Sequence, residues 1–175
     1  MDFAFRDPGI SIDGELQLQL LETQLDTSGE ATLPTYRFAM LHSVRAVQMG
    51  FINLRIGHGD NLTLYRGHVG YGVEPEFRGH GYAARACRLL LPLALSHGIN
   101  PLWITCNPDN LPSRKTCERL GAELVEIITV PEETEAYRAG ARIKCRYRLD
   151  LITERGGIRT RYDLGGEALP IRQPE

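Results

Sequence analysis

The sequence has no excess of charge of either sign and no long hydrophobic run. Lys and Arg number 20 against 22 Asp and Glu in 175 residues. A balance of this kind creates no bulk field that favours nucleic acid or an anionic membrane surface. No apolar run approaches the roughly 18 residues that a membrane-spanning helix requires. We therefore expect neither nucleic acid nor membrane as a partner.

Cysteine is also scarce, and its four copies are scattered. They are Cys87, Cys106, Cys117 and Cys145, with no Cys-x-x-Cys pair. This spacing argues against a zinc site and against a disulfide framework, and it favours a reducing compartment. The first ten residues show no basic segment followed by an apolar one, as a secretory signal would. We expect a cytoplasmic globular protein of one domain that needs no metal.

The most informative stretch runs from Gly67 to Ser96 and predicts a strand, a turn, a glycine-rich loop and a helix. Residues 68–73 alternate β-favouring and small side chains, and Pro75 ends the strand because it has no N–H to donate. Glycines in residues 78–83 directly precede the predicted helix. They allow a close backbone approach, and the helix N-terminus attracts anions. The loop predicts a phosphate site, unless its glycines serve only the turn.

Two common phosphate loops do not fit this stretch. A P-loop requires Lys followed by Ser or Thr after its last glycine, and Tyr82 and Ala83 stand there instead. The dinucleotide-binding fingerprint has another glycine spacing and an acidic residue about 20 positions further on. Residues 100–102 supply no acid. Neither nucleotide-binding class is indicated.

Hydrophobic periodicity predicts the remaining elements. Strands are expected at 15–21, 36–42, 46–56, 102–106, 123–130 and 144–151, with helices at 82–97 and from Asn110 to about 120. A turn at 43–45 would join two antiparallel strands, residues 22–34 are expected to form a loop, and 62–66 lead into the strand at 68–73. The succession strand, helix, strand around residues 82–97 predicts a right-handed crossover between parallel strands.

Two motifs in order resemble the GNAT superfamily of N-acetyltransferases. Arg78, Gly81 and Ala83 occupy the fixed positions of its acetyl-CoA motif, Gln/Arg-x-x-Gly-x-Gly/Ala. The downstream family motif is Asn-x-x-Ala/Ser-x-x-x-Tyr-x-x-x-Gly-Phe. Its positions are matched by Asn110, Ser113 and Gly121, whereas Cys117 replaces Tyr and Ala122 replaces Phe. The resemblance extends over roughly residues 48–149.

The resemblance implies an α/β (α+β) fold with a mixed, mostly antiparallel central sheet and flanking helices. Its fourth and fifth strands, here 68–73 and 102–106, would run parallel and splay apart. Residues 1–152 would form one acyltransferase domain. Residues 153–175 would form a tail, either mobile or packed against a partner, and the family also suggests a homodimer.

The resemblance further implies acetyl-CoA as co-substrate, with no metal. The pantetheine arm would lie along the fourth strand and the pyrophosphate on the glycine loop. The implied CoA-binding residues are Tyr71, Gly72, Val73, Arg78, Gly79, His80, Gly81, Tyr82, Ala83, Asn107, Asn110 and Ser113. Taken singly, Asn110 is equally explained as a helix cap and Ser113 as a first-turn residue. Arg114 and Lys115 could reach the ribose phosphate.

The expected reaction is direct attack of a primary amine, on a small molecule or a protein, upon the thioester. Cys117 is the candidate acid for the leaving thiolate, although a buried packing role explains it as well. Glu74 is the candidate base, with His68 and Asn107 as alternatives, because Thr105 at a common base position cannot act as one at neutral pH. A second hypothesis is an acyl-CoA-binding module with little or no catalysis, and a third is a structural protein that keeps only the fold.

Overall fold

The computed structural model describes residues 3–9, 11–26, 32–154 and 157–159. Its larger sheet has five strands in chain order, and every neighbouring pair is antiparallel. The strands are β1 (Ser11–Asp13), β2 (Leu16–Asp26), β3 (Leu33–His42), β4 (Gln48–Arg55) and β5 (Val69–Val73). The predicted hairpin between the third and fourth strands is confirmed, with Ala46 in the left-handed region at φ 51°.

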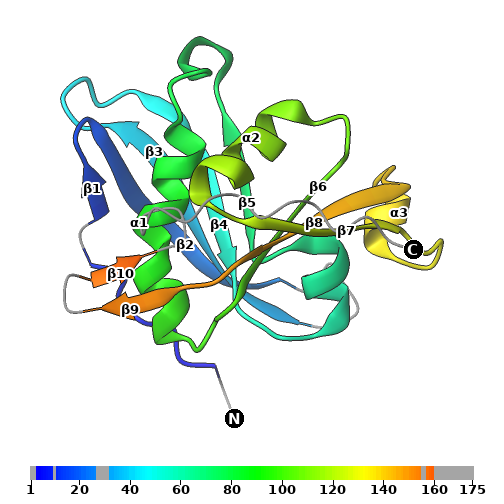
Figure 1. Cartoon of the computed structure of the whole chain (residues 1–175). Helices are drawn as coiled ribbons and strands as arrows, with labels where there is room; N and C mark the ends of the chain where they lie inside the picture. The colour runs from blue at the N-terminus through cyan, green and yellow to red at the C-terminus, as the bar shows by residue number, and fades with distance from the viewer. Residues whose placement is uncertain (1–2, 10, 27–31, 155–156, 160–175) are drawn as a thin grey trace.

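A second antiparallel sheet has the order β6-β8-β7. It comprises β6 (Leu102–Cys106), β7 (Glu123–Thr129) and β8 (Ile143–Leu149). The long helix α1 (Tyr82–Ser96) crosses one face of the larger sheet, and α2 (Leu111–Leu120) lies beside it near the second sheet (Figure 1). Shorter elements are η1 (Leu62–Arg66), η2 (Pro75–Phe77), α3 (Glu135–Arg138), β9 (Ile152–Glu154) and β10 (Gly157–Arg159).

The core lies between α1 and the larger sheet. Alternate β3 side chains, Tyr36, Phe38 and Met40, are almost fully buried, as period-two patterning requires. The apolar face of α1 packs in the same core, where Ala83, Ala86, Cys87, Leu90 and Leu91 are all buried. The helix continues through Pro92.

One sequence expectation needs correction, and two segments that the sequence left undefined gain a structure. Residues 22–26 and 33–34 are strand rather than loop, because polar Glu22 pairs with Arg37 across the ladder at 2.7 Å. Residues 62–66 form one turn of π-helix, closed where the Gly67 N–H donates to Leu62 O. Part of the predicted tail forms the β9–β10 hairpin, and the rest lies outside the described residues. No helix in the described part is long and apolar enough to cross a membrane.

The two sheets meet at β5 and β6 and then separate. A backbone hydrogen bond joins them, from His68 N–H to Trp103 O at 2.8 Å. Beyond it the two strands belong to different sheets. The splaying of this strand pair is therefore visible, whereas its parallel pairing stays a prediction.

Candidate functional site

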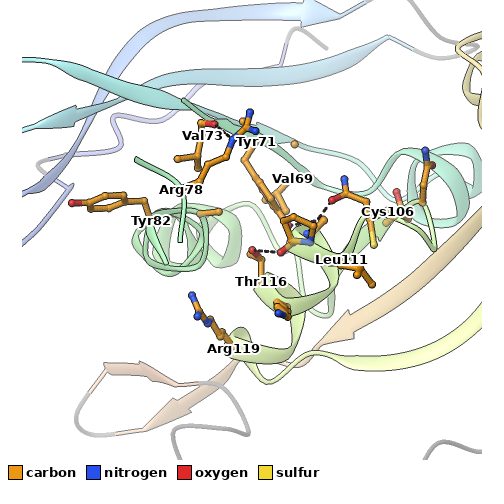
Figure 2. A pocket seen from close by; sticks show the side chains of 18 of the residues that line it. Val69, Tyr71, Val73, Arg78, Tyr82, Cys106, Leu111, Thr116 and Arg119 are labelled. Carbon is orange, nitrogen blue, oxygen red and sulfur yellow. Dashed lines mark hydrogen bonds between the residues drawn. The ribbon is translucent and has the colours of Figure 1, made fainter. Parts of the chain in front are cut away.

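A cleft of about 780 Å³ occupies the space where β5 and β6 separate. This volume lies within the range of small-molecule sites. Its walls are β5, the loop that follows it, the start of α1, the end of β6 and one face of α2. Figure 2 shows Arg78 and Tyr82 towards one end, Cys106 towards the other, and Tyr71 between them.

The edge of β5 that faces β6 offers backbone groups to a ligand. Glu74 N–H donates to Met49 O at 2.9 Å, so alternate residues of β5 bond to β4. The backbone groups of Tyr71 and Val73 therefore point the other way, towards the cleft. The Val73 carbonyl already accepts from Arg78 Nε at 2.9 Å, so the Tyr71 groups and the Val73 N–H are the ones that a ligand can use. An extended ligand can bond to this edge as an additional strand would.

The glycine loop leads into α1 through two left-handed residues. Gly79 has φ 83° and Gly81, the N-cap residue of α1, has φ 77°, both of which strongly favour glycine. The first backbone hydrogen bond of the helix runs from Arg85 N–H to Gly81 O at 3.1 Å. The amides before Arg85 have no intrahelical acceptor and stand at the positive end of the helix dipole. Gly79, Gly81, Tyr82 and Ala83 all line the cleft, which gives this end the character of an anion site.

Three cations surround the anion site, and they come from different elements. Arg78 and two α2 residues, Lys115 and Arg119, line the cleft here. An Arg119 nitrogen lies 3.1 Å from the position that a Cβ on Gly81 would take. Arg114 does not line the cleft, because its Nε donates to the Tyr147 hydroxyl at 3.2 Å. His80 is exposed and is also absent from the lining, since its Nδ1 donates to the carbonyls of the loop.

The start of α2 is tied to β5 by a short chain of hydrogen bonds. Asn110 Oδ1 accepts from the Ser113 N–H at 3.1 Å, which confirms the predicted cap. Ser113 Oγ in turn lies 2.8 Å from the Tyr71 hydroxyl. All three residues line the cleft. Burial raises the pKa of Tyr71, so the phenol keeps its proton at neutral pH.

Two neighbouring thiols differ in their access to the cleft. Cys117 is completely buried and does not line the cleft, whereas Cys106 does. A hydrogen bond between them lowers the pKa of Cys106 and, together with burial, raises the pKa of Cys117. The candidate acid named from the sequence is therefore the less accessible of the two. Its catalytic role stays a prediction.

Of the candidate bases, Glu74 lies outside the cleft and His68 is already occupied, whereas Asn107 lines the cleft. Glu74 is exposed beyond the end of β5 and does not line the cleft. His68 is 1% exposed, and both its ring nitrogens bond to backbone groups. Asn107 lines the cleft, as does Thr105, whose hydroxyl donates to Tyr65 O at 3.0 Å. Within the described residues, no carboxylate and no histidine lines the cleft.

Sequence reasoning missed a second group of cations in the cleft. Arg55, Arg66 and Lys144 line the end near Cys106 and the start of β5. They come from β4, η1 and β8, so no local spacing links them. The alternation of polar and apolar residues in 143–149 was the one available signal, because it places Lys144 on the face opposite the buried Cys145.

Residues 5–123 match the model of the family described as acetyltransferase (GNAT) domain. The chain belongs to this family. No curated protein sequence gave a significant match.

Solved structures of this family share the fold at low identity. A probable GNAT-family acetyltransferase from Chromobacterium violaceum aligns with a TM-score of 0.55 and 14% identity, over 84% of this chain and 88% of its own. RimL, a ribosomal L7/L12 α-N-protein acetyltransferase, aligns with a TM-score of 0.52 and 12% identity, over 80% of this chain and 98% of its own. MccE, a microcin C7 self-immunity acetyltransferase solved with acetyl-CoA and AMP, aligns with a TM-score of 0.50 and 20% identity, over 65% of this chain. The match spans 59% of MccE, less than two thirds of that protein.

Proposed function

We propose that this protein is an N-acetyltransferase that moves an acetyl group from acetyl-CoA to a primary amine of a small molecule or a polypeptide. The observation that supports it is the continuous cleft from the free edge of β5 to the N-terminus of α1. The acetyl-CoA found with MccE, and the protein α-amine acceptor named for RimL, are consistent with this chemistry.

Acetyl-CoA would occupy the cleft in an order set by its charges. Its pyrophosphate would accept from the amides around Gly81, with Arg78 beside it. Lys115 and Arg119 would face the ribose phosphate. The pantetheine arm would bond to the edge of β5 at Tyr71 and Val73, which directs the thioester towards Cys106.

The chemical step needs the amine held against the thioester carbonyl and a proton supplied to the leaving CoA thiolate. The amine lone pair attacks the thioester carbonyl, the new C–N bond forms, and the C–S bond breaks to release CoA thiolate. Tyr71, whose hydroxyl lies midway along the cleft, is the first candidate to return the proton because of its position. Burial raises its pKa and weakens it as an acid, so Cys106, whose pKa the hydrogen bond with Cys117 lowers, is the second candidate. The ammonium proton passes to water, because no described carboxylate or histidine lines the cleft.

A second candidate is an acyl-CoA-binding protein with little catalysis. The absence of a carboxylate and a histidine from the described lining, together with the burial of Cys117, favours it. Both candidates require CoA binding. They differ in the release of free thiol when amines are added.

Thermal unfolding with acetyl-CoA, with ATP as control, tests the common requirement. Ligand at about a hundred times its Kd should add about 2.7 kcal/mol to the free energy of unfolding. Gly81→Ala should abolish this gain, whereas Gly98→Ala should keep it. Both glycines flank α1 at nearly equal φ, 77° and 75°, but only Gly81 lines the cleft. No gain for the unaltered protein would refute both candidates, and a gain without thiol release from any amine would leave the binding protein.

A further inference from the structure

The charge lining the cleft is entirely of one sign within the described residues. Six cations contribute to it and no carboxylate does: Arg55, Arg66, Arg78, Lys115, Arg119 and Lys144. Arg55, Arg66 and Lys144 lie near Cys106 and the start of β5. The other three surround the glycine loop. Two separate positive regions therefore face one cavity.

The region near the start of β5 is too distant to serve the pyrophosphate. β5 has five residues, Val69 to Val73, and rises about 3.3 Å per residue, so its ends are about 13 Å apart. Arg55 is fixed at the beginning of the strand, because its Nη1 donates to Gly67 O at 3.3 Å. The glycine loop begins only after the strand has ended. The first region needs a different anion.

This region lies on the sheet face that α1 and α2 leave open. In β5, Tyr71 reaches α2 through Ser113, so Gly70 and Gly72 face the other side. An Arg55 nitrogen lies 3.1 Å from where a Cβ on Gly70 would be, which puts its guanidinium over that face. In β8, Arg146 reaches η1 by donating to Thr63 O at 3.0 Å, and Lys144 shares its side of the strand.

Lys144 is the cation of this region whose charge no described carboxylate offsets. Arg66 is 3.4 Å from Glu135, which offsets one positive charge. Lys144 is partly buried and has no ion pair with any described carboxylate, and burial lowers its pKa. An anion beside its ammonium would compensate the lost solvation. The positive charge of Lys144 therefore remains where a second substrate would meet the thioester.

We propose that the acceptor amine carries an anionic group, a carboxylate or a phosphate, and that Arg55, Arg66 and Lys144 hold it on the open sheet face. This inference rests on the proposed acetyl transfer, since it names the class of amine that the same cleft accepts. Arginine forks bind carboxylate and phosphate through paired charge-assisted hydrogen bonds, and Lys144 adds a point charge. The amine is thereby oriented towards the acetyl carbon from the side opposite α1.

Matched amines test the proposal. β-Alanine is compared with its amide, phosphoethanolamine with ethanolamine, and a peptide beginning Ser-Glu-Glu with Ser-Gln-Gln. Each anionic member should exceed its neutral partner by about tenfold or more in kcat/KM, as charge-assisted hydrogen bonds imply. The pair with the largest difference in kcat/KM shows whether the anionic group of the acceptor is a small-molecule carboxylate, a phosphate or the side chain of an acidic peptide. Equal rates within every pair would overturn the proposal while leaving acetyl transfer intact.

Variants and a binding readout complete the test. Lys144→Met should remove most of the preference, while Arg148→Met, four residues along the same strand and outside the cleft, should keep it. The same amines are added to protein saturated with CoA, so that the loop site is filled. Anionic members should raise the Tm of the unaltered protein and not of the Lys144 variant. If neither turnover nor a selective rise in Tm occurs, the anion site itself is refuted, whereas a selective rise without turnover refutes only the transferase function.

Discussion

His68 Nδ1 accepts a hydrogen bond from the Trp103 N–H at 2.8 Å, beside the point where the two sheets separate. The other ring nitrogen must then carry the proton that it donates to Gly57 O at 3.0 Å. His68 also uses its own backbone N–H to bond Trp103 O. The residue is therefore a fixed neutral connector between β6 and the loop before η1, and its environment does not suit a catalytic base.

The first prediction concerns the pH dependence that this connector creates. Burial lowers the pKa of His68 in the folded state, so its contribution to stability is complete above the unfolded pKa of about 6.5 and declines as pH falls below it. His68→Gln should lose about 2 kcal/mol from the two side-chain hydrogen bonds at pH 8, and less at pH 5. Denaturant unfolding at the two pH values measures this, and an equal loss at both would contradict it. His97, whose pKa burial also lowers, stays unchanged in both proteins and cancels in the difference.

A second prediction separates acid-range stability from the His68 effect. Hydrogen bonding to Arg85 lowers the pKa of Glu15 to about 2, so this pair stabilises the fold above pH 4.5 and loses its effect as pH falls towards 2. Glu15→Gln should make stability less sensitive to pH between 4.5 and 2 and should not alter the response between 6.5 and 5. Urea midpoints across both ranges provide the measurement. Glu22→Gln, in an exposed pair with Arg37, is the control.

The third prediction distinguishes Tyr71 from Cys117 as the acid that returns the proton to the thiolate. Tyr71→Phe removes a proton donor from the cleft and should lower kcat by about a hundredfold, at the lower end of general acid catalysis. Cys117→Ala should leave kcat within about twofold and reduce stability by about 1 kcal/mol, because it removes one buried sulfur atom. Steady-state kinetics and unfolding are both needed. A larger kcat loss in the Cys117 variant would restore the interpretation made from the sequence.

The fourth prediction tests whether Asn110 is more than a cap. Asn110→Ala and Thr134→Ala each remove a side-chain acceptor at a helix N-terminus, from Ser113 N–H and Tyr137 N–H respectively. Each should cost about 1 kcal/mol of stability. Only Asn110 lines the cleft, so only its variant should weaken acetyl-CoA binding in calorimetry. Equal affinities for the two variants would reduce Asn110 to a cap.

A fifth prediction uses two facing glycines. A Cβ on Gly50 would stand 2.2 Å from the Gly72 carbonyl oxygen, whereas the atoms nearest to a Cβ on Gly72 would be those of the Phe51 ring. Backbone cannot move as an exposed ring can. Gly50→Ala should therefore cost about 3 kcal/mol and Gly72→Ala about 1 kcal/mol or less, as overpacking estimates suggest. Chemical denaturation of both variants gives the comparison, and similar costs would show that the ring is held as firmly as the strand.

The sequence was sufficient where a local signal determines the structure. Asn110 and Gly121 bound α2 because a side-chain acceptor and a left-handed residue are local requirements. Residues 62–66 were expected only to lead into the next strand, because their Leu-Thr-Leu pattern carries no helical signal, whereas tertiary bonds such as Thr105 Oγ1 to Tyr65 O hold them in a helical turn. The cations at the start of β5 could not be predicted, since three distant elements bring them together.

The separation of β5 from β6 leaves a strand edge inside the molecule. Open edges readily recruit strands from other chains, which is a common origin of aggregation. Here α2 lies beside the edge, and the bond between Tyr71 and Ser113 joins the two. The helix that shapes the cleft thus also shields it from a second copy of the chain. Substitutions that weaken the packing of α2 would expose the unpaired edge of β5, which favours aggregation, and would also disturb the cleft.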